Sequence, residues 1–146
     1  MYCMKIKIIR KNGCAILAVL CLIGLCIPFV DAYNGTESSM YSNVKNAKDY
    51  EVDYECMKYL DKYPQGEYVK DVSNILISKM KKDGDIKRTY KFGVRYASLE
   101  IGKKLKELSY KMAEIKNDYY SWSQYIEVCN IEDIKDAQER LNKCTN

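Results

Sequence analysis

Apolar residues recur three and four positions apart along the chain after residue 46, the spacing that places them on one face of an α-helix. The first stripe stops at 63–66, where Tyr-Pro-Gln-Gly ends a helix, and a second stripe begins directly after it. Two helices with apolar faces joined by so short a turn fold back on each other and bury those faces together. The stripes consist of Tyr50, Tyr54, Met57 and Leu60, followed by Tyr68, Val72, Leu76 and Met80.

The helical period resumes after a turn that ends at Asp85, a candidate N-cap residue. It continues over 86–115 and includes two interior glycines, Gly93 and Gly102, each of which costs about 1 kcal/mol inside a helix. The stretch is therefore either one long helix or a hairpin that bends near 97–100.

Two further helices complete the pattern. Asn117-Asp118 opens a helix that bears Trp122 and Cys129, and another follows Asn130. Strand-type alternation of apolar and polar residues is scarce along the chain. The predicted fold class is therefore all-α.

The chain also repeats itself in part. Residues 70–76 match 135–141 at a shift of 65, and at a shift of 33 the tyrosine-rich positions 59–72 meet apolar positions in 92–105. A period of 33 with paired helices is typical of tetratricopeptide-like repeats. We expect a repeat domain over 46–146 made of two to three antiparallel hairpins, at about 46–80, 84–116 and 117–144.

The segment Tyr59-Leu60-Asp61-Lys62-Tyr63-Pro64-Gln65-Gly66-Glu67-Tyr68-Val69-Lys70-Asp71-Val72 resembles the helical repeats of bacterial envelope proteins related to the outer-membrane-protein assembly lipoproteins. Those repeats use a tyrosine-proline turn, a small residue, and then an aromatic residue followed four positions later by a small apolar one. The resemblance covers about 25 residues here and, in part, the last 26. It implies a binding scaffold in the cell envelope and carries over no catalytic residue.

The first 32 residues predict export. Lys5, Lys7, Arg10 and Lys11 precede an uncharged apolar run over 14–30, as in a signal peptide, and Val30-Asp31-Ala32 fits cleavage after Ala32. An uncleaved membrane anchor at 14–30 is the main alternative, since this run is slightly shorter than the hydrocarbon core. A lipoprotein signal fits poorly because Leu25 precedes Cys26, and a buried core helix is a further alternative. In the first two cases residues 33–146 lie outside the cytoplasm, periplasmic or secreted.

Residues 33–45 are short, polar and without period, so they predict a linker. Asn34-Gly35-Thr36 within them is a glycosylation sequon, relevant only in an organism that glycosylates.

Net charge and cysteine count change once the leader is set aside. Beyond residue 32 the chain is nearly neutral, so its basic pI does not argue for nucleic acid as a partner.

Three cysteines remain there, Cys56, Cys129 and Cys144. Cys129 and Cys144 fall near the same ends of consecutive helices, too far apart for a bridge, so we interpret the cysteines as small buried residues rather than a disulfide framework.

Most catalytic chemistry is excluded by the residues present. The chain has no histidine, which removes Ser-His-Asp, Cys-His and HExxH sites, and residues 33–146 contain no CxxC pair or glycine-rich phosphate loop. Two carboxylate pairs, Glu51 with Glu55 and Glu132 with Asp136, are best read as solvated helix faces. We therefore expect no catalytic residue, metal or cofactor.

Positive charge gathers in the middle of the sequence. Residues 79–111 hold eleven basic and four acidic side chains, whereas 33–78 and 112–146 are each acidic. Lys87, Lys91 and Arg95 fall four apart and form a basic stripe, with Arg88 beside it. Two interpretations remain open: acidic neighbours neutralise this hairpin, or the stripe is a docking surface for anionic lipid, envelope polymer or an acidic protein.

These patterns together predict a non-catalytic, extracytoplasmic protein-binding or adaptor module whose partner is another envelope protein. The alternative is a structural or assembly subunit held at the membrane by residues 14–30, with oligomerisation possible, and an enzyme of unfamiliar type is a distant third. Tyrosines suit partner contacts because they are large and amphipathic, although the same residues also fill cores. The candidate contacts are Tyr54, Tyr59, Tyr90, Tyr96 and Tyr125.

Overall fold

The computed structural model describes residues 35–144, and within that range every regular element is a helix. The predicted all-α fold class is confirmed for these residues. The predicted leader and Asn34 of the sequon lie outside them. The helices are α3 (Glu37–Asn46), α4 (Val52–Lys62), α5 (Val69–Asp83), α6 (Ile86–Arg95), α7 (Glu100–Lys116), α8 (Tyr119–Ile126) and α9 (Ile131–Lys143).

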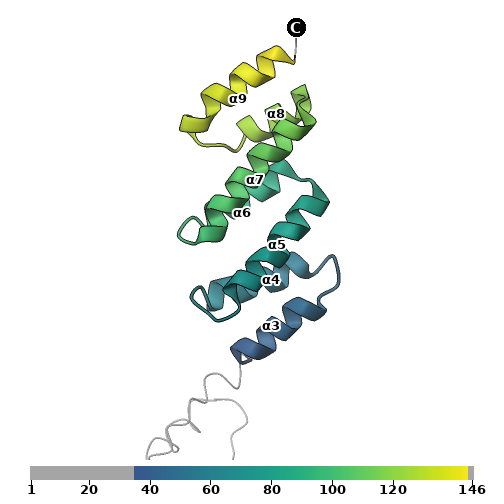
Figure 1. The fold of residues 1–146 in the computed structure, drawn as a ribbon, viewed down its shortest axis with the longest axis vertical. Coiled ribbons are helices and arrows are strands. Elements are labelled where there is room, and N and C mark those ends of the chain that lie inside the picture. The colour runs from purple at the N-terminus through teal and green to yellow at the C-terminus, as the bar shows by residue number, and fades with distance from the viewer. Residues whose placement is uncertain (1–34, 145–146) are drawn as a thin grey trace, which may run out of the picture.

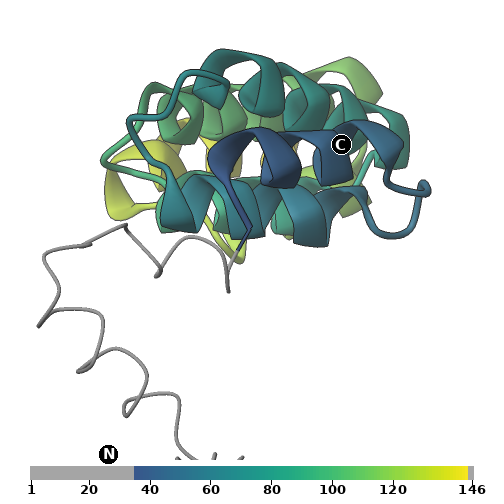
Figure 2. The same cartoon turned by 90° about the horizontal axis from the view of Figure 1, so that it is seen from below.

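The helices form an elongated stack that advances from α3 at one end to α9 at the other (Figure 1). Seen along the long axis, they lie one behind another (Figure 2). Packing joins α4 to α5, α6 to α7 and α8 to α9, and it also joins α5 to α7 and α6 to α8. Helices two apart in sequence therefore stack side by side, which is how a short chain covers its apolar faces without a central sheet.

The stretch over 84–116 is two helices and not one. Asp85 caps α6 as predicted, because its carboxylate accepts the backbone N–H of Arg88 at 2.9 Å. The helix ends at Arg95, and Leu99 has an extended backbone before α7 begins at Glu100. The bend thus falls near 97–100, as the hairpin alternative predicted.

The predicted linker at 33–45 is wrong, because most of it forms α3. Thr36 caps this helix by accepting the backbone N–H of Ser39 at 3.2 Å, and Met40 and Val44, four residues apart, are buried. The Tyr59 hydroxyl also donates to the Glu37 carboxylate, which ties α3 to α4. The packed domain therefore begins about ten residues before the predicted start at 46.

Two apolar clusters make up the interior, one at each end of the stack. The first joins α3, α4 and α5 to residues of the α6–α7 bend, and the second joins the other ends of α6 and α7 to α8 and α9. Leu108 on α7 packs against both. Tyrosine and tryptophan rings fill much of this space, with Trp122 fully buried and in edge contact with Tyr110.

Two further observations bear on the predictions above. None of the described helices is both long enough and apolar enough to cross a bilayer. The three cysteines of the described region are free thiols, with Cys56 buried. The interpretation of Cys56 as a small buried residue is confirmed, whereas Cys129 and Cys144 are only half-buried.

Candidate functional site: a basic groove on one face of the stack

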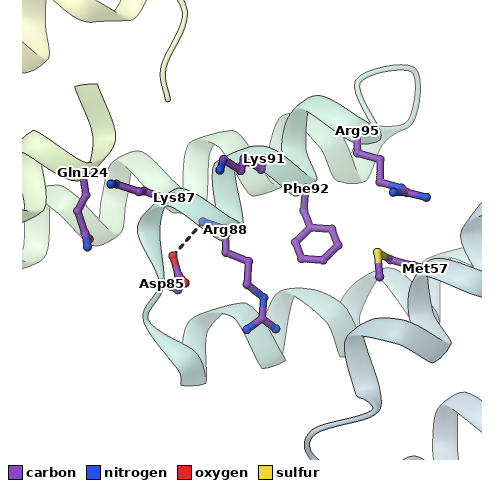
Figure 3. Close-up of a pocket in the computed structure, with 8 residues that line it drawn as sticks. All are labelled: Met57, Asp85, Lys87, Arg88, Lys91, Phe92, Arg95 and Gln124. Atoms are coloured by element: carbon purple, nitrogen blue, oxygen red, sulfur yellow. Dashed lines mark hydrogen bonds between the residues drawn. The ribbon is translucent and has the colours of Figure 1, made fainter. Parts of the chain in front are cut away.

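A hollow of about 690 Å³ lies between α4, α6 and α8. α6 supplies most of its wall, because residues three and four apart in a helix lie on the same face. Figure 3 shows these side chains along α6, with Met57 of α4 at one end and Gln124 of α8 at the other. The lining residues are Met57, Asp85, Lys87, Arg88, Lys91, Phe92, Arg95 and Gln124.

All four residues of the predicted basic stripe line this groove. The one acidic residue of the lining, Asp85, is engaged in capping α6. By its lining residues alone, the groove carries four cationic side chains and one carboxylate, which caps α6. The structure therefore brings the predicted stripe together at one concave surface.

Carboxylates from neighbouring elements pair with most of these cations. Lys87 pairs with Glu127 of the α8–α9 connection. Arg88 pairs with Asp53 of α4 and, at 3.3 Å, with Asp83 of α5. The interpretation in which acidic neighbours neutralise the basic hairpin is thus supported at these positions.

Arg95 and Lys91 differ in their surroundings. Arg95 lies 2.6 Å from Asp61 of α4, and this hydrogen bond raises the pKa of the Arg95 guanidinium above its ordinary value. Lys91 is exposed, and no carboxylate among residues 35–144 forms an ion pair with it. Lys91 is therefore the stripe residue whose charge is most available to a ligand.

The floor of the groove is apolar. Phe92 and Met57 are half-buried and pack against the first apolar cluster while still lining the hollow. A flat ring and a flexible thioether form a surface that adapts to an apolar side chain. The groove thus combines cations along one wall with an apolar floor.

Most of the predicted tyrosine contacts are wrong, because those side chains are buried and cannot touch a partner at the surface. Tyr59, Tyr90, Tyr96 and Tyr125 are buried, and only Tyr54 of the five is exposed. The buried hydroxyls serve the fold: that of Tyr90 accepts the backbone N–H of Asn130 at 2.9 Å, and that of Tyr96 donates to Asp61 at 3.1 Å. Burial raises the pKa of Tyr96 to about 12, and the hydrogen bond to the Asp61 carboxylate acts in the same direction.

Three of the four carboxylates in the two predicted pairs have ordinary surface partners. Glu51 accepts the backbone N–H of Lys48, and Glu55 pairs with Lys58. Asp136 accepts the Tyr110 hydroxyl at 2.5 Å, whereas Glu132 is exposed. Within the described residues, no group of cysteine and carboxylate side chains could hold a metal ion.

Sequence reasoning missed the apolar floor, and it did not identify which acidic residues pair with the stripe. Phe92 directly follows Lys91, so the apolar residues adjacent to a basic stripe were an available signal for a mixed groove. The pairing of Lys87 with Glu127 joins residues 40 apart, and no local pattern contains that contact.

No protein-family model matches the chain, and comparison with curated proteins and with solved structures likewise gives no match.

Proposed function

We propose that this chain is a non-catalytic, extracytoplasmic protein of tetratricopeptide-like helical hairpins, which binds another protein of the cell envelope through the basic groove. The observation that carries the proposal is the groove itself, in which Lys87, Arg88, Lys91 and Arg95 lie over the apolar pair Met57 and Phe92. Mixed apolar and cationic concave surfaces suit recognition of a peptide or protein segment.

The recurrence of buried positions supports the repeat architecture. Cys56, Thr89 and Trp122 follow one another at intervals of 33, and all three are fully buried in α4, α6 and α8. Val72, Leu105 and Ala137 recur at nearly the same interval in α5, α7 and α9 and are also fully buried. Equivalent positions with equivalent burial are what stacked copies of one hairpin produce.

Site-specific crosslinking in the native cell envelope tests this function. A photoreactive residue replaces Lys91 in one variant and Lys135 of α9, an exposed lysine outside the groove, in the other. We expect a protein adduct from position 91 and none from position 135. Mass spectrometry identifies the adduct and the N-terminus of the exported chain, which reports whether cleavage follows Ala32. Equal crosslinking from both positions, or none from position 91, would contradict the proposal.

An assembly subunit is the second candidate, and exposed apolar side chains favour it. Ile115 is 82% exposed and Tyr120 70% exposed, on either side of the α7–α8 connection, and Tyr119 beside them is also exposed. Clustered exposed apolar residues mark association surfaces. The mass of the exported protein in solution decides: a stable oligomer that Ile115→Ser converts to monomer supports this role, whereas a monomer at all concentrations contradicts it.

A further inference from the structure

We infer that the basic groove is neutralised by the protein's own Glu127 and Asp61, and that its occupant is an extended acidic peptide segment which displaces them. This inference rests on the proposed binding function and specifies the chemistry of the partner. Three observations carry it: the different exposure of the paired acids, the spacing of the cations on α6, and the apolar floor beside them.

The internal ion pairs fall into two kinds. The side chains of Glu127 and Asp61 are 64% and 45% exposed, so their pairs with Lys87 and Arg95 lie in contact with water. The acids that hold Arg88, Asp53 and Asp83, are only 18% and 19% exposed. Exposed pairs contribute little and exchange readily, whereas a partly buried pair is costly to break. A ligand carboxylate can therefore replace Glu127 or Asp61, while Arg88 keeps its partners.

The cations along α6 have a regular spacing. Lys87, Lys91 and Arg95 are successive fourth residues of one helix, so they stand about 6 Å apart along its axis. Alternate side chains of an extended peptide are about 6.6 Å apart on one side of its backbone. A segment with acidic residues at every second position thus matches the three cations in register. Lys91, exposed and without an ion pair among the described residues, is the first that such a segment would engage.

The floor adds a second requirement. Phe92 and Met57 lie beside the cations and remain half-buried, so part of their apolar surface is uncovered. A partner with only charged residues would leave that surface exposed to water. An apolar or aromatic residue within the acidic segment would cover it.

Fluorescence anisotropy with the full exported protein tests the inference. The probe is a labelled peptide with glutamate at alternate positions and one central phenylalanine, compared with the same peptide carrying glutamine for glutamate. We expect the acidic peptide to bind at least tenfold more tightly, with affinity falling as salt rises. Equal binding of the two peptides would overturn the inference.

Removal of one internal competitor gives the sharper result. Glu127→Gln should tighten binding of the acidic peptide about two- to fivefold, because the ligand no longer displaces a carboxylate from Lys87. Glu139→Gln, which removes the same charge at an exposed site on α9 outside the groove, is the matched control. Asp61 is less suitable because it also accepts the Tyr96 hydroxyl. Equal affinity of the Glu127→Gln variant and the control would overturn the inference that Glu127 neutralises the groove in the absence of a ligand.

Charge reversal within the groove should have the opposite effect. Lys91→Glu should weaken binding about tenfold or more, whereas Lys135→Glu on α9 should change it less than twofold. Lys91→Gln, which removes the charge without reversing it, should give an intermediate loss in a protein of unchanged helicity.

If photocrosslinking from position 91 finds a protein partner while the two peptides bind equally, only the acidic specificity fails. If the acidic peptide binds as expected but no crosslink forms, the envelope-protein function fails and the anion-binding groove stands.

Discussion

Gly93 on α6 and Gly102 on α7 face each other where the two helices cross, and a methyl group on either would lie within 2.9 Å of the other's carbonyl oxygen. The Gly102 position is the tighter of the two, because its methyl group would also lie 2.2 Å from the carbonyl oxygen of Tyr96. Backbone atoms cannot rotate out of the way as a side chain can. The close approach of α6 and α7 therefore requires glycine at both positions.

Gly102→Ala should destabilise the domain by about 2 to 3 kcal/mol, because overpacking against backbone forces the two helices apart. Helix propensity alone predicts the opposite sign, a gain of about 1 kcal/mol for alanine over glycine. Urea unfolding followed by circular dichroism distinguishes the two. Gly84→Ala is the comparison, since Gly84 has a left-handed backbone but open space around it, and about 1 kcal/mol is expected there. A neutral or stabilising Gly102→Ala would refute the close crossing.

Met40→Ala on α3 should destabilise the domain by about 2 to 3 kcal/mol, since Met40 is buried in the first apolar cluster and its removal leaves a cavity. Asn43→Ala, on the exposed side of the same helix, is the matched control and should change stability by less than about 0.5 kcal/mol. Thermal or urea unfolding provides the measurement. Equal stability of the two variants would return residues 37–46 to the status of a linker.

Tyr96 should make stability fall at alkaline pH. Burial and the Asp61 carboxylate raise the pKa of Tyr96 to about 12 from its ordinary 10.0, so the folded state holds this proton more tightly than the unfolded state does. The contribution is fully present below pH 10 and is lost as pH rises from 10 through 12.

The difference in unfolding free energy between the native protein and Tyr96→Phe isolates this contribution, because other ionisations cancel. We expect the difference to be constant up to about pH 9.5 and to shrink by about 1 to 2 kcal/mol by pH 11.5. Tyr120→Phe, at an exposed tyrosine, is the matched control. A difference that grows with pH would mean that Tyr96 does not carry the raised pKa.

Cys56 should resist thiol reagents in the folded protein. Burial raises the pKa of the Cys56 thiol to about 12 from its ordinary 9.0, which lowers its thiolate fraction at pH 8 about a thousandfold. Cys144 is only half-buried and should be modified first. Mass spectrometry of labelled peptides after timed exposure to iodoacetamide measures both rates. Comparable rates under native conditions, with equal rates in urea as the reference, would show that Cys56 is accessible.

The sequence predicted the helices best where local signals set their ends. Asp85 could be read as a cap, and the shift of 33 offered a hairpin with a break near 97–100 as the alternative to one long helix. The helix α3 was missed because only Met40 and Val44 mark its buried face within a polar segment, too few to show a period. Two apolar residues identify the buried face of a helix only when the helix that packs against them is known.

Only part of the candidate site could be predicted, because only part of it lies on one helix. The basic stripe lies on a single helix, so its spacing was visible in the sequence. Its partners Asp61 and Glu127 lie 34 and 40 residues away, a distance that only folding closes. The tyrosines were misplaced because a tyrosine suits both a core and a surface, and only its hydrogen-bond partner tells which. The Tyr96 hydroxyl, at the end of α6, donates to Asp61 of α4, a contact between two different helices.

The division of the interior into two clusters, joined through Leu108, has a consequence for how such a chain can change in length. No single centre must be rebuilt when a pair of helices is gained or lost, because each cluster is closed by its own terminal helices. Duplication of a segment the length of α6–α7 would add another cluster in series and lengthen the groove face. If the proposed repeat architecture holds, a chain of this plan can grow longer without first losing the stability of the clusters it already has.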